Sequence, residues 1–232
     1  MNASSNDIRT NSDKSTIYED RGWKRSDPVP DHIYDIHMSL VEEEVIIRSE
    51  IISCSKQFIS KIEKDRAIKF SSKLGSAIKI GINLEGSFKE KRIQKKQLKQ
   101  ICIGLHAMNK SIKIVILSSP KKATKVKEII NELELNFVFA SYLTNTINDL
   151  AALVEQLDIV ITPDTSIVHI AGAFDKPVIS IHENNQISFR LWAPISSLRH
   201  TVFAKSDYGI FGYSVDEIID SAKDMLTKME LD

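Results

Sequence analysis

The chain has 232 residues, 42% of them hydrophobic, with 31 basic and 31 acidic side chains. A formal net charge of zero offers no electrostatic attraction to nucleic acid, so we expect no nucleic-acid partner. The hydrophobic share is typical of a globular protein, and the length is enough for one substantial domain with a smaller partner. No apolar run approaches the roughly 18 residues that a membrane-spanning helix needs.

The cysteines and the N-terminal sequence indicate a reducing compartment. Cys54 and Cys102 are the only cysteines and form no paired-cysteine motif, so we expect both to be free thiols. The N-terminal sequence lacks the apolar segment of a secretory signal. The sequence therefore predicts a cytoplasmic protein.

The first part of the chain differs in composition from the rest. Residues 1–30 are rich in Asn, Ser, Asp and Lys, which bury little apolar surface, so a disordered arm is predicted. Residues 31–76 are expected to be a short, mainly helical segment, because apolar residues recur at helical spacing between Ser39 and Arg66.

One short motif near the N-terminus contains metal-ligating residue types. The sequence DHIYDIH covers residues 31–37, but on a strand the side chains of His32 and Asp35 would point to opposite faces. Metal sites require a fixed ligand geometry, so no metal site is predicted here.

From Ile78 onwards, short apolar runs alternate with stretches of helical periodicity. The expected strands cover residues 78–84, 112–118, 136–141, 158–162, 177–181 and 200–204. The expected helices cover residues 94–108, 121–134, 147–156, 166–174 and 215–229. Such alternation predicts an α/β fold over residues 77–232, a Rossmann-like doubly wound parallel sheet with helices on both faces. Ligands of such sheets bind beyond the carboxyl ends of the strands.

The junction after the fourth expected strand is the strongest candidate for a ligand site. Pro163 cannot donate a ladder hydrogen bond, so the strand should end there. Asp164, Thr165 or Ser166 is then placed to cap the next helix, whose N-terminal N–H groups suit a phosphate. Thr165 and His169 are four residues apart and share a helix face. Two interpretations stay open, a phosphate site and an ordinary capped junction with His169 in the core.

Further polar residues follow the carboxyl ends of the neighbouring strands. Lys91 follows the first strand in a Gly- and Lys-containing loop, where it could bind a phosphate or lie in a solvated basic loop. Ser119 follows the second strand, as a pocket residue or a helix cap. The residues expected at the rim of the pocket are Ser87, Ser119, Thr144, His182 and Arg190.

The run from Asp158 to Ile181, DIVITPDTSIVHIAGAFDKPVISI, resembles the nucleotide-sugar-binding signature of glycosyltransferase family 9, the ADP-heptose:lipopolysaccharide heptosyltransferases. That signature contains Asp-Thr-Gly after an apolar strand, a His on the following helix, and then Ala-Ala and Gly-Lys-Pro. The matching residues are Asp164, Thr165, His169, Ala171, Ala173, Lys176 and Pro177. Ser166 stands where many members have Gly. The resemblance covers roughly Ile78 to Met229.

The resemblance implies that this is the C-terminal, donor-binding half of a GT-B glycosyltransferase. It implies metal-independent transfer of a sugar, a heptose in this family, from a nucleotide-sugar such as ADP-heptose. The acceptor would be lipopolysaccharide or a related glycan, no separate cofactor would be needed, and the chain could act as a peripheral protein at the inner membrane surface. The residues implied to bind the donor diphosphate are Asp164, Thr165, Ser166, His169 and Lys91.

The sequence departs from the family pattern in two ways. In the family, an N-terminal domain binds the acceptor and supplies a catalytic Asp, but only residues 1–76 precede the donor-type domain here. A truncated N-terminal domain is therefore expected, and no catalytic base is assigned. No acidic residue follows the strand ending at Ser118, where family members hold the ribose, so the nucleotide base stays open. The alternative function is a non-catalytic module that binds a nucleotide-sugar or phosphate, or a degenerate family member.

Overall fold

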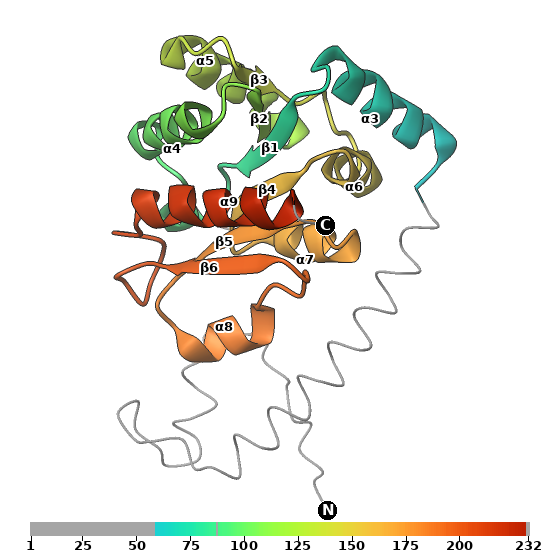
Figure 1. Cartoon of the computed structure of the whole chain (residues 1–232). Helices are drawn as coiled ribbons and strands as arrows, with labels where there is room; N and C mark the ends of the chain where they lie inside the picture. The colour runs from blue at the N-terminus through green and yellow to red at the C-terminus, as the bar shows by residue number, and fades with distance from the viewer. Residues whose placement is uncertain (1–58, 87, 231–232) are drawn as a thin grey trace, which may run out of the picture. The chain divides into compact units, whose positions relative to one another are not determined.

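The computed structural model describes residues 59–86 and 88–230 (Figure 1). The predictions for the N-terminal arm, for the DHIYDIH motif, for Cys54 and for Ser87 lie outside these residues.

Six strands form a single parallel sheet with the order β3-β2-β1-β4-β5-β6. The strands are β1 (Ile78–Asn83), β2 (Ile112–Leu117), β3 (Val138–Ala140), β4 (Ile159–Pro163), β5 (Val178–His182) and β6 (Arg199–Phe203). The first strand, β1, thus lies in the middle of the sheet. Strands β2 and β3 follow on one side of it, and β4, β5 and β6 follow on the other. This is the Rossmann strand order, so the predicted doubly wound fold is confirmed.

The helices cover both faces of this sheet (Figure 1). They are α3 (Lys61–Lys73), α4 (Lys95–Met108), α5 (Ala123–Leu133), α6 (Ile147–Glu155), α7 (Ser166–Ala173), α8 (Gln186–Trp192) and α9 (Val215–Met229). Helices α4, α5 and α9 share one apolar cluster with the sheet, while α6 and α7 share another. Helix α3 packs on α6.

Burial on both faces explains why the strands are continuously apolar. Side chains of β1 alternate between the two sides, with Ile80 and Ile82 fully buried in the cluster that contains α4 and α9. On the other side, a Cβ atom at Gly81 would lie 2.3 Å from Leu157 Cδ1, so the chain after α6 packs directly on the strand backbone. Each fully buried Ile contributes about 1.5–3 kcal/mol to folding.

The element boundaries differ from the predicted ones at several points. Strand β3 is shorter than residues 136–141, because a turn with a hydrogen bond from Val138 N to Leu135 O takes up the two preceding residues. The helix expected over residues 121–134 is split into a 3₁₀ turn, η3 (Pro120–Lys122), and α5. The helical periodicity seen up to Arg66 continues to Lys73 at the end of α3.

Helix α8 was not predicted from the sequence. Asn185 starts this helix, because its side chain accepts a hydrogen bond from Ser188 N at 3.0 Å. Trp192 lies at its end with 37% of its surface exposed.

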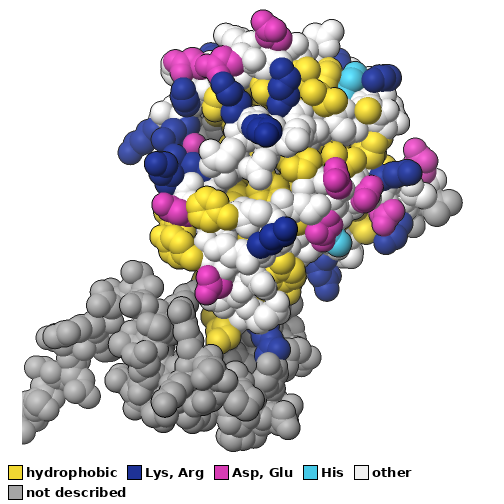
Figure 2. Space-filling model, turned by 90° about the vertical axis from the view of Figure 1, so that its left-hand side faces the viewer, with side chains coloured by type: hydrophobic (Ala, Val, Ile, Leu, Met, Phe, Trp, Pro, Cys, Tyr) yellow, Lys and Arg dark blue, Asp and Glu magenta, His cyan; other side chains and the backbone are white. Residues whose placement is uncertain are grey.

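Charges of both signs are mixed on the surface. Figure 2 shows Lys and Arg side chains interspersed with Asp and Glu on the face to the left in Figure 1, where α4 and α5 lie. This distribution agrees with the zero net charge of the sequence. In the part of the chain that the structure describes, no helix is both long and apolar enough to cross a lipid bilayer.

We predict that the Cys102 thiol is inert in the native protein. Its side chain is buried in α4, and burial raises the pKa of the thiol to about 12, so almost no reactive thiolate forms at pH 8. In a Cys54→Ser variant, a thiol reagent at pH 8 should label nothing in buffer and one thiol per chain in denaturant. Fast labelling in buffer would show that α4 opens away from the sheet.

Candidate ligand-binding site

The carboxyl ends of β1 and β4 are the centre of the candidate site. These two strands pair in parallel, but the chain continues from β1 toward β2 and from β4 toward β5. The connections therefore diverge at this edge, which is where open α/β sheets bind ligands. A cavity of about 350 Å³ lies here, lined by the ends of β1 and β2, the segment 144–147 and the start of α7.

Asn83 connects the two central strands at the floor of this cavity. Its buried side-chain amide donates to Glu85 O at 2.8 Å, to Thr162 Oγ1 at 3.0 Å and to Thr165 Oγ1 at 3.3 Å. The two threonine hydroxyls also lie 3.1 Å apart. Asn83 thus ties the end of β1 to the residue that begins α7. Sequence reasoning missed this role, although Asn83 is the polar side chain near the carboxyl end of the apolar run IKIGINL.

The junction between β4 and α7 has the predicted form. The strand ends at Pro163, and Thr165 is the residue that caps the helix, since its hydroxyl accepts from Ile167 N at 3.3 Å. Thr165 and Ser166 line the cavity, and Ser166 is exposed there. Unpaired N–H groups at the start of α7 therefore lie beside the cavity, together with the partial positive charge of the helix end.

Lys91 lies in a second polar cluster at the same edge, and it is buried. Its ammonium group is 3.4 Å from Asp164 Oδ2 and 3.3 Å from Glu183 Oε2, and only 8% of its side chain is exposed. The loop before it must be tight, because a Cβ atom at Gly86 would lie 2.1 Å from Lys91 O. The interpretation of Lys91 as part of a solvated basic loop is therefore wrong. Glu183, the second carboxylate, was not identified from the sequence.

His182 is buried beside this cluster at the end of β5. Its ring packs against Phe189, with centroids 5.2 Å apart, and its Nε2 atom has no hydrogen-bond partner among the residues described. Burial lowers the pKa of His182, and the positive charge of Lys91 lowers it further. The nearby carboxylates of Asp164 and Glu183 act in the opposite direction but do not reverse the shift.

Seven of the predicted site residues therefore fall into two groups. Thr165, Ser166, Ser119 and Thr144 line the cavity, where the Thr144 hydroxyl donates to Ser118 O at 3.1 Å. Asp164, Lys91 and His182 form the neighbouring cluster, joined to the cavity through the peptide bond between Asp164 and Thr165. The remaining two residues lie near α8. These are His169, half-buried with its ring 5.9 Å from that of Trp192, and Arg190, half-buried on α8.

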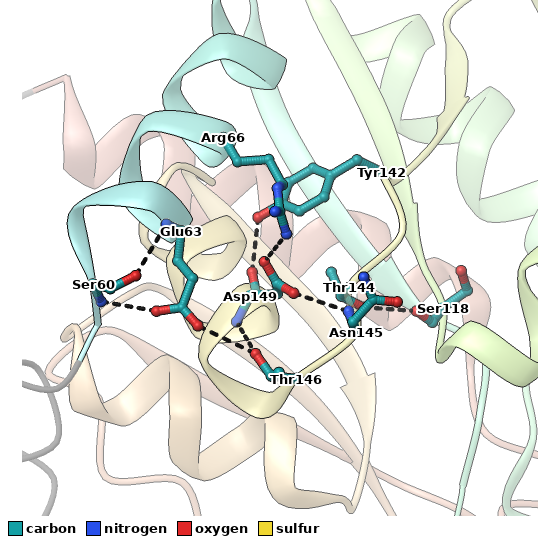
Figure 3. Close-up of polar contacts among 9 residues, drawn as sticks. All are labelled: Ser60, Glu63, Arg66, Ser118, Tyr142, Thr144, Asn145, Thr146 and Asp149. Atoms are coloured by element: carbon teal, nitrogen blue, oxygen red, sulfur yellow. Dashed lines mark hydrogen bonds and ion pairs between the residues drawn. The ribbon is translucent and has the colours of Figure 1, made fainter.

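The rim of the cavity is held by contacts with α3 (Figure 3). Asp149 is buried at the start of α6, where its carboxylate accepts from Arg66 Nη1 at 2.5 Å and from Asn145 N at 3.0 Å. The Thr146 hydroxyl donates to Glu63 Oε1 at 3.3 Å. Two side chains of α3 therefore fix the segment whose residues line the cavity.

The side chains described do not gather into a metal-binding cluster. Within residues 59–86 and 88–230, no three His, Cys, Asp or Glu side chains are arranged so that they could hold a metal ion.

Comparison with known proteins identifies relatives of this fold. Residues 40–207 match the model of glycosyltransferase family 9 (heptosyltransferase). No curated protein sequence matches the chain. Among solved structures, it is similar to a family 9 glycosyl transferase from Veillonella parvula DSM 2008, with 17% identity and a TM-score of 0.62 over 73% of this chain and 53% of that one.

Two structures from E. coli are similar to the same degree. ADP-heptose lps heptosyltransferase II has 16% identity and a TM-score of 0.58, over 74% of this chain and 53% of that one. Heptosyltransferase WaaC with ADP has 15% identity and a TM-score of 0.55, over 68% of this chain and 48% of that one. The chain thus spans about half the length of these relatives, and at such identities the likeness establishes the fold.

We predict that His182 makes stability depend on pH. The folded state holds this group with a pKa below the ordinary value of about 6.5, so the unfolded chain binds the proton more readily. The stability that neutral His182 contributes is present above pH 6.5 and is lost as the pH falls, by at most about 1.4 kcal/mol per pH unit. Urea unfolding from pH 8 to pH 5 should show a shallower decline for His182→Phe than for the natural chain. Parallel declines would show that His182 does not carry this dependence.

We predict that the contact between Arg66 and Asp149 stabilises the rim. Replacing Arg66 by Met leaves a carboxylate that is 4% exposed without its cation, whereas Arg66 itself is 43% exposed. Solvent screening reduces the effect, so the loss should be about 1–2 kcal/mol in the free energy of unfolding. Lys64→Met, an exposed change on the same helix, is the matched control and should have little effect. Equal unfolding midpoints for the two variants would contradict this role.

Proposed function

Since the chain belongs to glycosyltransferase family 9, we propose that it binds the nucleotide-sugar donor of a glycosyl transfer reaction. The observation that carries this proposal is the cavity at the carboxyl ends of β1 and β2, bounded by the N-terminus of α7. Its volume of about 350 Å³ lies within the usual range for small-molecule sites.

The proposed ligand pose follows from the distribution of donors around the cavity. The diphosphate is placed at the start of α7, where backbone N–H groups of Thr165 and Ser166 and the helix dipole favour negative charge. The nucleoside then occupies the part of the cavity lined by Ser119 and Thr144. His169 lies one helical turn beyond Thr165, within the same helix.

The chemistry of the reaction explains why these groups would matter. When the acceptor hydroxyl attacks the anomeric carbon, the bond from that carbon to the diphosphate oxygen breaks and negative charge grows on the leaving diphosphate. Fixed dipoles and cations at that oxygen lower the barrier, because they stabilise charge that is larger in the transition state than in the substrate. The start of α7 and the ammonium group of Lys91 would supply this stabilisation without a metal ion. A diphosphate would share Lys91 with Asp164 and Glu183.

The identity of the donor, the identity of the acceptor and the location of the protein belong to the same proposal. The donor would be ADP-heptose and the acceptor lipopolysaccharide or a related glycan, supported by the heptosyltransferase description of the family. The E. coli structures named for ADP-heptose and for ADP have the same fold. The chain would then act in the cytoplasm, as a peripheral protein at the membrane where such acceptors are made. We assign no catalytic base among the described residues.

A non-catalytic donor-binding module is the second candidate. It is favoured by the pairing of Lys91 with the carboxylates of Asp164 and Glu183, which neutralises the cation that a departing diphosphate needs. A module of this kind would bind nucleoside diphosphates but would not transfer sugar.

We predict that titration calorimetry with ADP, UDP, GDP and CDP will show binding, with ADP preferred. His169→Ala should weaken binding about five- to a hundredfold, the effect of losing one hydrogen bond. Ser166→Gly should bind equally well or more tightly, since the backbone can approach the phosphates more closely. His200→Ala, on the exposed part of β6, is the control and should bind normally.

Two results would count against this function. If none of the four nucleotides binds, the cavity is not a nucleotide site. If His169→Ala unfolds the domain and leaves residual affinity unchanged, His169 is a core residue. Incubation with ADP-heptose and a lipopolysaccharide core acceptor, with transfer followed by mass spectrometry, then separates the enzyme from the non-catalytic module.

A further inference from the structure

A second cavity, of about 420 Å³, lies between the start of α4 and the loop that joins β6 to α9. This volume is within the usual range for small-molecule sites. None of its lining residues also lines the cavity beside α7. The two cavities are neighbours, because Glu85 lines the first, Arg92 lines the second, and these side chains form an ion pair with a distance of 3.9 Å.

Amide and ammonium groups from the start of α4 form one part of the lining of the second cavity. Gln94, Gln97 and Gln100 recur at intervals of three residues, so they follow one face of this helix start. Each amide group can donate and accept hydrogen bonds at the same time. Lys96 adds an exposed cation on the same helix.

Arg92 has bonding capacity that the described residues leave unused. Its Nη2 atom lies 3.9 Å from Glu85 Oε2, which is too far for a hydrogen bond. Its Nε atom is buried and has no hydrogen-bond partner among the described residues. A guanidinium group binds a carboxylate or a phosphate through two parallel hydrogen bonds. Since Glu90 is the carboxylate in this lining and Arg92 and Lys96 are the cations, the lining side chains carry a net charge of +1, which favours an anion.

An aromatic ring completes the lining, and the loop that carries it is held in place. Phe211 is 54% exposed, yet its carbonyl accepts from Lys205 N at 3.0 Å. The preceding residue, Ile210, is buried and donates from its backbone N–H to Glu90 O at 3.0 Å. Gly209 has a φ of +73°, and a Cβ atom there would lie 2.8 Å from Glu90 O, so this close approach requires glycine. The exposed ring of Phe211 is therefore fixed at the cavity by its own loop.

We propose that the second cavity binds a saccharide that carries a phosphate or carboxylate group. The ring of Phe211 offers an apolar face against which the C–H groups of a sugar ring pack. The three amides and the Glu90 carboxylate pair with the sugar hydroxyls, because these groups supply both donors and acceptors. Arg92 and Lys96 bind the anionic group through charge-assisted hydrogen bonds. A small number of polar groups around an apolar surface is the usual composition of a small-molecule site.

This inference does not depend on nucleotide binding in the cavity beside α7, since the two linings share no residue. It gives the chain a second ligand next to the first, because the contact between Glu85 and Arg92 joins the two cavities. The anionic sugar has two sources, a free sugar phosphate or an anionic residue within a longer glycan. The chemistry of the lining is the same for both, and the experiment distinguishes them.

The test is a set of saturation-transfer NMR titrations on the full chain with glucose 6-phosphate, mannose 6-phosphate and galacturonate. Glucose, mannose, galactose and inorganic phosphate are titrated in parallel. At least one anionic sugar should bind about tenfold or more tightly than its neutral parent and than phosphate, the effect of one charge-assisted bond. Raising the salt concentration should weaken this binding.

Variants assign the binding to the second cavity. Lys96→Gln should weaken binding of the anionic sugar about tenfold, and Phe211→Ala about two- to tenfold. Lys99→Gln, an exposed change on α4 outside the lining, is the matched control and should bind normally. All three variants should melt at the temperature of the natural chain and should bind ADP as it does, because none of these residues lines the first cavity.

The possible outcomes separate this inference from the proposed function. If no anionic sugar binds, or if inorganic phosphate binds as tightly as the sugar phosphates, the saccharide site is overturned, whatever the result with ADP. Sugar binding that neither Lys96→Gln nor Phe211→Ala weakens also overturns it. If both variants lose binding only to phosphatidylglycerol vesicles, the surface contacts a membrane and the inference is wrong. When sugar binding is found, tighter binding of phosphorylated pentamannose than of mannose 6-phosphate assigns the site to a glycan, and equal binding assigns it to a free sugar phosphate.

Discussion

The parallel pairing of β1 with β4 is the constraint on which the site depends. Its register joins Ile80 to Ile159 and Ile82 to Ile161, so both strands end at the same level of the sheet. Because the chain leaves these strands in opposite directions, no connection covers their ends. Asn83 and Thr165 meet in the space that is left, and the positive end of α7 faces it. The place of the candidate site at this edge is thus a consequence of topology before any side-chain chemistry is considered.

A cluster of one cation and two carboxylates lies beside the cavity at this edge. The buried ammonium group of Lys91 is compensated by Asp164 and Glu183, as burial of a cation requires. A diphosphate that bound Lys91 would weaken the existing ion pairs of this ammonium group. The affinity for the diphosphate would then be the difference between the ion pairs gained with phosphate and the ion pairs lost with the carboxylates. The N–H groups of Thr165 and Ser166 at the start of α7 take no part in these ion pairs, whereas those of Ile167 and Val168 bond to Thr165 within the helix start. In the proposed mode of binding, the helix end is therefore the stronger determinant of phosphate affinity, and Lys91 modulates it.

The sequence was sufficient for the sheet and for the junction at Thr165, because both depend on local signals. Continuous β-branched runs indicate buried parallel strands, and Pro163 followed by a capping residue marks the end of one strand and the start of a helix. Contacts between residues that are far apart in the sequence have no such local signal. The pairs of Lys91 with Glu183 and of Arg66 with Asp149 join residues whose approach depends on how separate elements pack. Helix α8 had one local signal that was overlooked, the capping residue Asn185.

The rim of the cavity depends on a helix that lies outside the β/α alternation. Helix α3 packs on α6 through Ala67 and Ala152, whose small side chains allow the two helices to approach closely. Because the two helices pack in this way, Arg66 donates to the buried carboxylate of Asp149, which in turn accepts a hydrogen bond from Asn145 N. A change in α3 would therefore alter the cavity wall without touching any residue that lines it. The site is thus determined at two levels, by the sheet topology for its location and by the packing of α3 for the shape of its rim.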